Sequence, residues 1–551
     1  GLNRIFKPAP YGAEEPKNES TANLVQNAGG ERCWSATTVL RMNDKSYSVQ
    51  LDGKELTPSI IDQVFGRPIR VNVAGSVMAK VAENRNQLDQ LIKQDRPFYG
   101  INTGFGSLCD RKISPDRLET LQENLLMSHA VGVGEPVPDD IVRLMMLFKI
   151  LSLSRGHSGV RPQTLETLVQ MLSADLLPVV PSKGSLGASG DLAPLAHLAL
   201  PLIGRGMVRT NGRTTKAAEA LAESDIQPVK LGAKEGLALI NGTQFMSAYG
   251  AALCLRACRL CKIADILAAM SLEAVRGRTE PFDVRIHTIR PHPGALTVAH
   301  NMRELLSDRP LAPSKPYGVR VQDPYSLRCV PAVHGATRDA LKHVEKVTYR
   351  EINSVTDNPL VFEGAILSGG NFHGQPLALT LDYLAIAGAE LASISERRQY
   401  LLVNDSHYGL PAGLVSNSGL NSGFMIAHYT SAALVAENKV LCHPASVDSI
   451  STSGGQEDHV SMGATSALKC WQIVDNVERV LGIELVLAAQ ALEFTPAVEL
   501  APTIRHAFET VRQQIPVADG DREFGIDIET ATSLVRSQAV TRAVEDSIGS
   551  L

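Results

Sequence analysis

The chain has 551 residues, of which 44% are hydrophobic and 20% are charged. This composition can bury a large core and excludes wholesale disorder. The 53 lysines and arginines against 58 acidic residues give a formal charge of -5, so no basic field marks nucleic acid as a partner.

The predicted elements begin with a short strand and a helix. Residues 1–46 are rich in Pro, Gly, Asn and Glu, which predicts a poorly ordered extension. Residues 47–57 alternate like a strand that turns at Asp52-Gly53. Thr57-Pro58 is typical of an N-cap and first helical turn, and we expect that helix to end near Phe65. Residues 47–154 are expected to form a smaller N-terminal domain of mixed helices and short strands.

Long helical patterns dominate the rest of the chain, over residues 375–401, 425–441 and 466–492. In the first pattern leucines share one face while Leu379 and Ile386 are apolar elsewhere, which predicts a helix buried nearly all round. Ala and Leu dominate these stretches and only 5% of residues are aromatic, which favours close helix packing. The sequence therefore predicts a mainly α fold, with a long-helix bundle domain over 155–551.

Three kinds of special segment are not expected. The longest apolar runs, 192–204 and 480–492, are interrupted and shorter than the about 20 residues of a membrane span. Eight scattered cysteines make no disulfide framework, which favours a reducing, cytoplasmic setting. Cys258-Arg-Leu-Cys261, with Cys254 nearby, falls on one helix face without a second pair, so core cysteines are expected and no metal is predicted.

The loops between the helices are polar, long and rich in glycine, and such loops commonly hold the chemistry of an enzyme. They are residues 99–107, 183–194, 241–244, 321–328, 368–374 and 454–462.

The loop Gly187-Ala188-Ser189-Gly190-Asp191 is the most informative of them. A serine hydrolase elbow needs G-x-S-x-G, which fails here, and the phosphate-loop pattern G-x-x-x-x-G-K-[ST] is absent from the chain. A plain turn, with Asp191 as the N-cap of a helix that starts near Leu192, is an ordinary alternative.

Self-cyclisation is the remaining interpretation. A turn that presses the Gly190 nitrogen against the Ala188 carbonyl carbon could close a five-membered ring, and glycine leaves that approach open. Loss of two waters, one of them from the Ser189 hydroxyl, would leave a methylene conjugated to carbonyl groups. That product is an electrophile that no standard side chain provides, and the helix N-terminus beyond it would stabilise negative charge on the ring oxygen.

A series of further motifs accompanies this loop in the order YGINTGFG, GSLGASGDLAPLAHLAL, KEGLALINGTQ, QDPYSLRC, INSVTDNPL, GGNFHG and QEDHVSM. From about residue 50 to 535 the chain thereby resembles the aromatic amino acid ammonia-lyases and aminomutases. The resemblance implies a mainly α-helical homotetramer whose active sites are built from three subunits. It also implies a 4-methylideneimidazol-5-one (MIO) group, formed autocatalytically from Ala188, Ser189 and Gly190.

The resemblance implies catalytic roles for several residues. Tyr99, in a glycine-rich lid loop, would remove the β-proton of the substrate, and Arg328 would bind the substrate carboxylate through a bidentate fork. Asn241 would donate to that carboxylate or to the MIO oxygen. Gln322 and Tyr325 are similar to family residues around the MIO group and substrate. Packing for Tyr99, an ion pair for Arg328 and an Asn-Gly turn for Asn241 are the ordinary alternatives.

Two further residues are expected beside the substrate ring. Phe372 would pack against the MIO ring or the substrate, although a core phenylalanine is nearly as good an interpretation. His129 would contact the substrate ring or its ammonium group, with a satisfied buried histidine as the alternative.

The choice of substrate depends on Ser128-His129 and on Glu457. Some tyrosine-specific members share the Ser-His pair, whereas phenylalanine-specific members tend to carry Phe-Leu. Histidine-specific members have Glu at the position of Glu457, where phenylalanine and tyrosine enzymes usually have Gln. An imidazole needs an acceptor for its N–H or a counter-charge, whereas a buried carboxylate facing a phenyl ring loses solvation and gains nothing. A helix-terminal carboxylate paired with Lys or Arg is the alternative for Glu457.

We therefore expect elimination of ammonia from L-histidine to give trans-urocanate, with neither nucleic acid nor membrane as a partner. A tyrosine or phenylalanine ammonia-lyase, or an aminomutase of the same family, is the alternative.

Overall fold

The computed structural model describes residues 46–94, 96–108, 110–307, 321–404, 408–494 and 500–551. These residues belong to one compact unit. The predicted extension over 1–46 lies outside them except for its last residue. The division into domains at 47–154 and 155–551 stays a prediction.

The first described elements match their sequence signals. Strand β1 (Tyr47–Leu51) pairs in parallel with β2 (Ile69–Val73), and helix α1 (Pro58–Val64) connects them. The Thr57 hydroxyl accepts a hydrogen bond from the Ile60 amide at 3.4 Å, so the predicted N-cap is confirmed.

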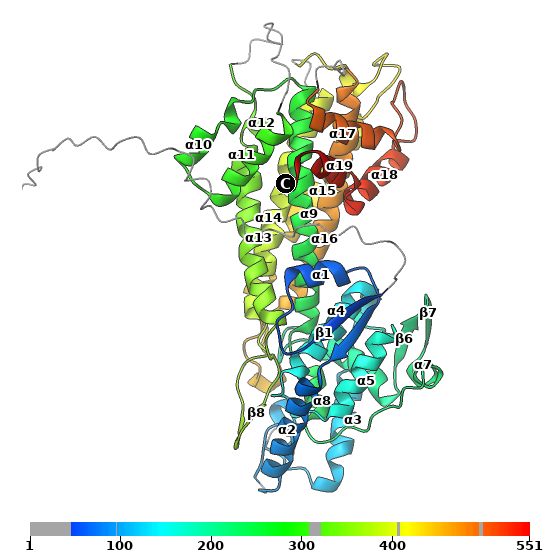
Figure 1. Cartoon of the computed structure of the whole chain (residues 1–551), viewed down its shortest axis with the longest axis vertical. Helices are drawn as coiled ribbons and strands as arrows, with labels where there is room; N and C mark the ends of the chain where they lie inside the picture. The colour runs from blue at the N-terminus through cyan, green and yellow to red at the C-terminus, as the bar shows by residue number, and fades with distance from the viewer. Residues whose placement is uncertain (1–45, 95, 109, 308–320, 405–407, 495–499) are drawn as a thin grey trace, which may run out of the picture. The chain divides into compact units, whose positions relative to one another are not determined.

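Long helices packed along one another form the bundle (Figure 1). They are α9 (Gln244–Ala274), α13 (Val330–Ile352), α14 (Gln375–Asn404), α15 (Met425–Leu441) and α16 (Gly463–Leu492). The predicted helices over 375–401, 425–441 and 466–492 are confirmed within three residues at each end. Helix α9 is buried along nearly its whole length, and Cys254, Cys258 and Cys261 are buried in it.

Shorter helices flank this bundle. They are α2 (Gly75–Ile92), α3 (Leu118–His129), α4 (Asp139–Ser154), α5 (Pro162–Ser173), α6 (Leu192–Ala199), α7 (Ala217–Glu223), α8 (Glu235–Ile240), α10 (Val284–Thr288), α11 (Pro293–Leu305), α12 (Tyr325–Arg328), α17 (Pro502–Arg512), α18 (Phe524–Ser537) and α19 (Ala539–Ile548). Figure 1 shows α2, α3 and α8 at one end of the bundle, and α10, α11 and α12 at the other.

The remaining strands are short and antiparallel, as expected for a mainly α fold. Strand β3 (Val133–Pro136) pairs with β5 (Pro181–Lys183), and β8 (Leu360–Phe362) pairs with β9 (Ala365–Leu367). A further sheet has the order β4 (Leu177–Pro178), β6 (Met207–Thr210) and β7 (Arg213–Lys216).

Helix α14 departs from its prediction. It was expected to be buried nearly all round, yet Leu379, Tyr383, Ile386 and Tyr400 are between 43% and 53% exposed. The helix packs on α9, α13, α15 and α16, and these four side chains stay partly exposed on the rest of its surface. Within the described residues α14 is also the one helix long and apolar enough to cross a membrane, although 72% of its most apolar window is buried in the protein.

Candidate active site

The Gly187–Asp191 loop forms a tight turn in which Gly187 and Gly190 have positive φ angles of 73° and 78°, a conformation that favours glycine. Gly187 and Gly190 pair across the turn, and Ser189 has the left-handed φ of 51° that is uncommon for a residue with a side chain. Gly190 lies so close to Gly242 that an added Cβ would be 2.1 Å from the Gly242 carbonyl oxygen. The turn is therefore held in a strained, closely packed conformation centred on Ser189.

The carboxylate of Asp191 fastens this turn to the start of helix α9. The predicted helix does begin at Leu192, but the Asp191 side chain makes no cap bond there. Its Oδ2 instead accepts from the amides of Phe245 and Met246, each at 3.0 Å, and its Oδ1 accepts from the Ser185 hydroxyl at 3.1 Å. Asp191 is the N-cap residue of α6 by position, but the prediction that its side chain caps that helix was wrong, because the carboxylate accepts from the free amide donors of α9 instead. Burial raises the pKa of Asp191 to about 7.

Asn241 lies directly against the turn. It is the C-cap of α8, and its side-chain amide donates to the Ser189 carbonyl oxygen at 2.9 Å. Its Oδ1 is buried and has no hydrogen-bond partner among the described residues. A buried polar atom without a partner is rare in folded proteins and marks a place where a further group fits.

Glu457 reaches the same turn from the other side. The Ser189 hydroxyl donates to Glu457 Oε1 at 3.4 Å, although the two residues are 268 positions apart. The Thr452 hydroxyl donates to Glu457 Oε2 at 3.2 Å, and the Thr452 amide donates to the Glu457 carbonyl at 2.9 Å. Within the described residues, no Lys or Arg pairs with this half-buried carboxylate, as the predicted alternative required.

Tyr99 and His129 complete this group. The Tyr99 hydroxyl accepts from the Gly106 amide at 3.3 Å, which closes the glycine-rich loop onto the ring. His129 ends helix α3, with its Nδ1 at 2.9 Å from the Leu125 carbonyl oxygen. Burial lowers the pKa of His129, whereas the Leu125 carbonyl and the Glu457 carboxylate raise it, with a net lowering. A neutral imidazole that donates to Leu125 fits this geometry.

A cavity of about 500 Å³ brings these residues together. Tyr99, His129, Ser189, Asn241 and Glu457 line it, with apolar side chains of α3, α6, α8 and the glycine-rich loop around them. The polar side chains Arg111, Asn124, Ser128 and Ser453 also belong to the wall. A concave, mostly apolar chamber with a few convergent polar groups is typical of a small-molecule site.

Three predicted residues lie elsewhere. Gln322, Tyr325 and Arg328 lie in or just before α12, at the opposite end of the bundle from α3 and α8 (Figure 1). Arg328 donates through Nε to the Asp323 carbonyl at 2.9 Å, and its guanidinium lies 4.4 Å from the centre of the Tyr325 ring. None of the three lines the cavity of this chain.

Phe372 lies nearer but outside the cavity lining. It belongs to the loop that precedes α14 and is half buried. The adjacent His373 has its Nε2 at 3.2 Å from the His459 carbonyl oxygen, and the rings of the two histidines stack at 5.8 Å. The Phe372 loop is thus attached to the segment that carries Glu457.

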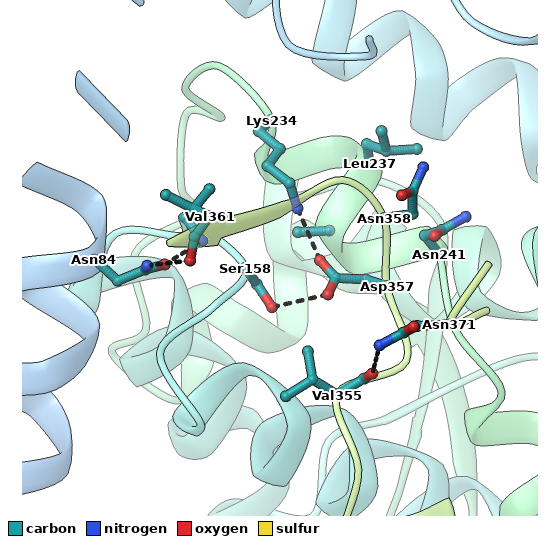
Figure 2. Close-up of polar contacts among 12 residues, drawn as sticks. Asn84, Ser158, Lys234, Leu237, Asn241, Val355, Asp357, Asn358, Val361 and Asn371 are labelled. Atoms are coloured by element: carbon teal, nitrogen blue, oxygen red, sulfur yellow. Dashed lines mark hydrogen bonds and ion pairs between the residues drawn. The ribbon is translucent and has the colours of Figure 1, made fainter. Parts of the chain in front are cut away.

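The motif INSVTDNPL contacts the N-terminal end of helix α8. Lys234, the N-cap of α8, pairs with Asp357 at 2.8 Å, and both side chains are buried. Figure 2 shows this pair with the Ser158 hydroxyl, which donates to Asp357 at 3.2 Å, and with Asn241 in the same close-up. The motif therefore fixes the helix that carries Asn241 and contributes no side chain to the cavity wall.

Sequence reasoning missed Arg111 and Asn124 of the cavity lining, and beside the site it missed the buried Lys149 of α4. The available signal was a single lysine within the apolar run 144–153. In the part of the chain that the structure describes, no cluster of His, Cys, Asp or Glu has the arrangement of a metal site.

The chain is similar over most of its length to known proteins. The family model for aromatic amino acid lyases matches residues 56–513. A histidine ammonia-lyase of Symbiobacterium thermophilum is 51% identical over 501 residues, which cover 91% of this chain and 99% of that protein. The crystal structure of histidine ammonia-lyase from Trypanosoma cruzi is 42% identical, with a TM-score of 0.84 over 91% of this chain and 95% of that one. Tyrosine aminomutase from Streptomyces globisporus is 37% identical, with a TM-score of 0.86 over 91% and 99% of the two chains.

Proposed function

The chain belongs to the aromatic amino acid lyase family, and we propose that it is a histidine ammonia-lyase that converts L-histidine to trans-urocanate and ammonia. It is a carbon–nitrogen lyase, like the relatives it matches. The observation that carries the substrate assignment is the Glu457 carboxylate, 3.4 Å from the Ser189 hydroxyl at the wall of a cavity that also holds His129.

The family is known for the MIO group, and we propose that Ala188, Ser189 and Gly190 form it here. Three features support this assignment: the tight turn, the approach of Gly190 to Gly242 that leaves no room for a Cβ, and the buried Asn241 Oδ1 without a partner among the described residues. Once formed, the group would supply an electrophilic methylene that activates the amino group of the substrate for departure.

The residues of the cavity have separate tasks in this proposal. Asn241 holds the Ser189 carbonyl oxygen with a donor that is already in place, which stabilises negative charge there. Glu457 accepts from the imidazole N–H of the substrate. Neutral His129 contacts the substrate ring or ammonium group, and Tyr99 takes the β-proton.

The second group of predicted residues requires a second copy of the chain. We propose that Gln322, Tyr325 and Arg328 of one subunit, and Phe372 of another, complete the cavity of a neighbour in a homotetramer. The exposed apolar face of α14 supports such an assembly, since exposed apolar surface of this kind marks an interaction site. Arg328 would then bind the substrate carboxylate.

We further infer a reducing, cytoplasmic setting. Among the described cysteines, Cys329, Cys442 and Cys470 are free thiols. The small-molecule ligands of the protein would be L-histidine and urocanate.

Product identity tests the proposal. The purified protein should convert L-histidine into a product with the ultraviolet spectrum of urocanate, with one ammonia released per product. L-tyrosine and L-phenylalanine are the controls. Coumarate or cinnamate as the main product would favour the alternative lyases, and a β-amino acid would favour an aminomutase, the activity named for the Streptomyces neighbour.

A further inference from the structure

Lys149 is a buried charged group to which the proposed reaction gives no task. It lies in α4 between apolar neighbours such as Phe148 and Ile150, and only 1% of it is exposed. Lysine is almost never fully buried unless it is paired, because its charged form loses hydration. A lysine at this position must therefore make contacts that an apolar side chain could not make.

The Lys149 ammonium contacts the C-terminal end of α8. Its Nζ donates to the Asn241 carbonyl oxygen at 2.8 Å and to the Ala238 carbonyl oxygen at 3.2 Å. The last carbonyls of a helix have no partner within it, and a basic side chain stabilises them. At the other end of α8 the buried pair of Lys234 and Asp357 holds the N-cap. Helix α8 is thus fixed at both ends by a buried lysine.

Asn241 connects this anchor to the cyclising turn. The residue whose carbonyl accepts from Lys149 also donates through its side-chain amide to the Ser189 carbonyl oxygen at 2.9 Å. Loss of water from Ser189 requires removal of its Cα proton, and the resulting charge is delocalised onto that oxygen. A donor held in place before the charge develops stabilises it most, because no reorganisation is then needed.

We propose that Lys149 is a positioning residue, which holds the end of α8 so that the Asn241 amide faces the Ser189 carbonyl oxygen. This inference rests on the proposed function and deepens it. Lys149 touches neither the substrate nor the reacting atoms and acts only through Asn241.

The cyclisation that Lys149 assists is balanced without a co-reactant. The Gly190 nitrogen forms a bond to the Ala188 carbonyl carbon. One water leaves with that carbonyl oxygen and the amide protons of Gly190 and Ser189, and a C=N bond to the Ser189 nitrogen forms. A second water takes the Ser189 hydroxyl and its Cα proton, and a C=C bond forms. The chain becomes lighter by about 36 Da, and nothing is oxidised or reduced.

A double-mutant cycle tests the proposal on the purified enzyme, with Lys149→Met, Asn241→Ala and both together. Intact mass gives the cyclised fraction, and kinetics with L-histidine give kcat and KM. Lys149→Met should lower the cyclised fraction and reduce kcat roughly tenfold, with KM nearly unchanged, since the interaction matters most in the transition state. In the Asn241→Ala background the same substitution should change either quantity by less than about twofold.

Lys262→Met is the matched control for loss of a buried lysine. Lys262 is 4% exposed in α9 and pairs with Glu545 at 2.6 Å, outside the cavity lining. The Lys262→Met variant should have a lower melting temperature but unchanged cyclisation and kcat. If it impairs cyclisation as Lys149→Met does, the positioning role is overturned.

Two other results would also overturn it: complete cyclisation with normal kcat in Lys149→Met, or effects that simply multiply in the double mutant. If Lys149→Met does not fold, Lys149→Gln replaces it, because its shorter amide retains a donor. Its effect should be smaller and should still vanish beside Asn241→Ala, and persistence there would overturn the proposal. A wild-type chain without the mass loss would refute the proposed function itself.

Discussion

The predicted catalytic residues at the cavity end of the bundle differ in their contacts from those at the α12 end. At the cavity end, Ser189 is hydrogen-bonded to Asn241 and to Glu457, and the three groups converge on one chamber. At the α12 end, Tyr325 is 69% exposed, and Arg328 donates to the Asp323 carbonyl oxygen and lies over the Tyr325 ring. A single chain therefore organises the turn that is proposed to form the electrophile and leaves the proposed carboxylate site without a substrate chamber.

The long helices show the same contrast. Helix α9 is buried by its neighbours, whereas α14 leaves Tyr383 and Ile386 exposed. One chain therefore buries the side chains around the turn, whereas apolar and aromatic side chains of α14 and α12 stay exposed to solvent. We attribute both incomplete regions to contacts between subunits.

The largest effect is expected at the cavity end, from Ser189→Ala. Without the hydroxyl, the second water cannot leave and no methylene forms. Turnover of L-histidine should fall by more than about a thousandfold, and the mass loss of about 36 Da should disappear. Intact-mass measurement and a urocanate assay check this, with circular dichroism to confirm that the helices remain. Near-normal turnover in this variant would refute the MIO assignment.

A comparably sharp test concerns the α12 end. Arg328→Ala removes the proposed bidentate partner of the substrate carboxylate and should lower kcat/KM by about a hundredfold or more. When Arg328→Ala and Ser189→Ala chains are assembled in equal amounts, a shared site can contain Ser189 from one and Arg328 from the other. Random assembly should then restore about a quarter of the wild-type activity.

The control for that mixture is the same pair of variants combined after separate assembly, without subunit exchange. Activity should stay at the level of the single variants. If co-assembled chains also show no recovery, Arg328 does not act in a neighbour's cavity, and the two ends of the bundle do not form one site.

Glu457→Gln should have the next largest effect. The amide retains the shape but loses the charge and one acceptor, so kcat/KM for L-histidine should fall by about ten- to a hundredfold. Residual turnover of L-tyrosine or L-phenylalanine should change much less. The neighbouring exposed Asp458, changed to Asn, is the control and should leave kinetics unaltered. An unchanged substrate preference in Glu457→Gln would reassign the carboxylate to a structural task.

The sequence predicted the features that depend on residues close together in the chain. Helix α15 spans the predicted residues 425–441, because a 3.6-residue apolar period is a local property. The tight turn at Ala188-Ser189-Gly190 was also readable from adjacent residues, while its cyclisation stays a prediction. The short strand β1 and the Thr57 N-cap follow from the same kind of local signal.

The features that the sequence did not predict depend on distant partners. Asp191 bonds to the start of α9, more than 50 positions away, and Lys149 bonds to Asn241 across 92 positions. No periodicity carries that information, since it arises only when helices pack. The exposed face of α14 was predicted to be buried because composition reports how apolar a face is and not which molecule covers it.

The smallest expected effect concerns the pH dependence of stability at His129. Burial lowers the pKa of this imidazole against the opposing effects of the Leu125 carbonyl and Glu457. A histidine whose pKa is lowered on folding contributes its full stability above the unfolded pKa of about 6.5, and that contribution is lost as the pH falls through the folded pKa.

His129→Gln keeps a donor for Leu125 and removes the titration. Between about pH 7.5 and 5.5 its Tm should therefore fall less than that of the wild type, by about 1 °C or less. Thermal scans of both proteins at both pH values measure this. An equal slope in His129→Gln would mean that folding does not lower the pKa of this histidine.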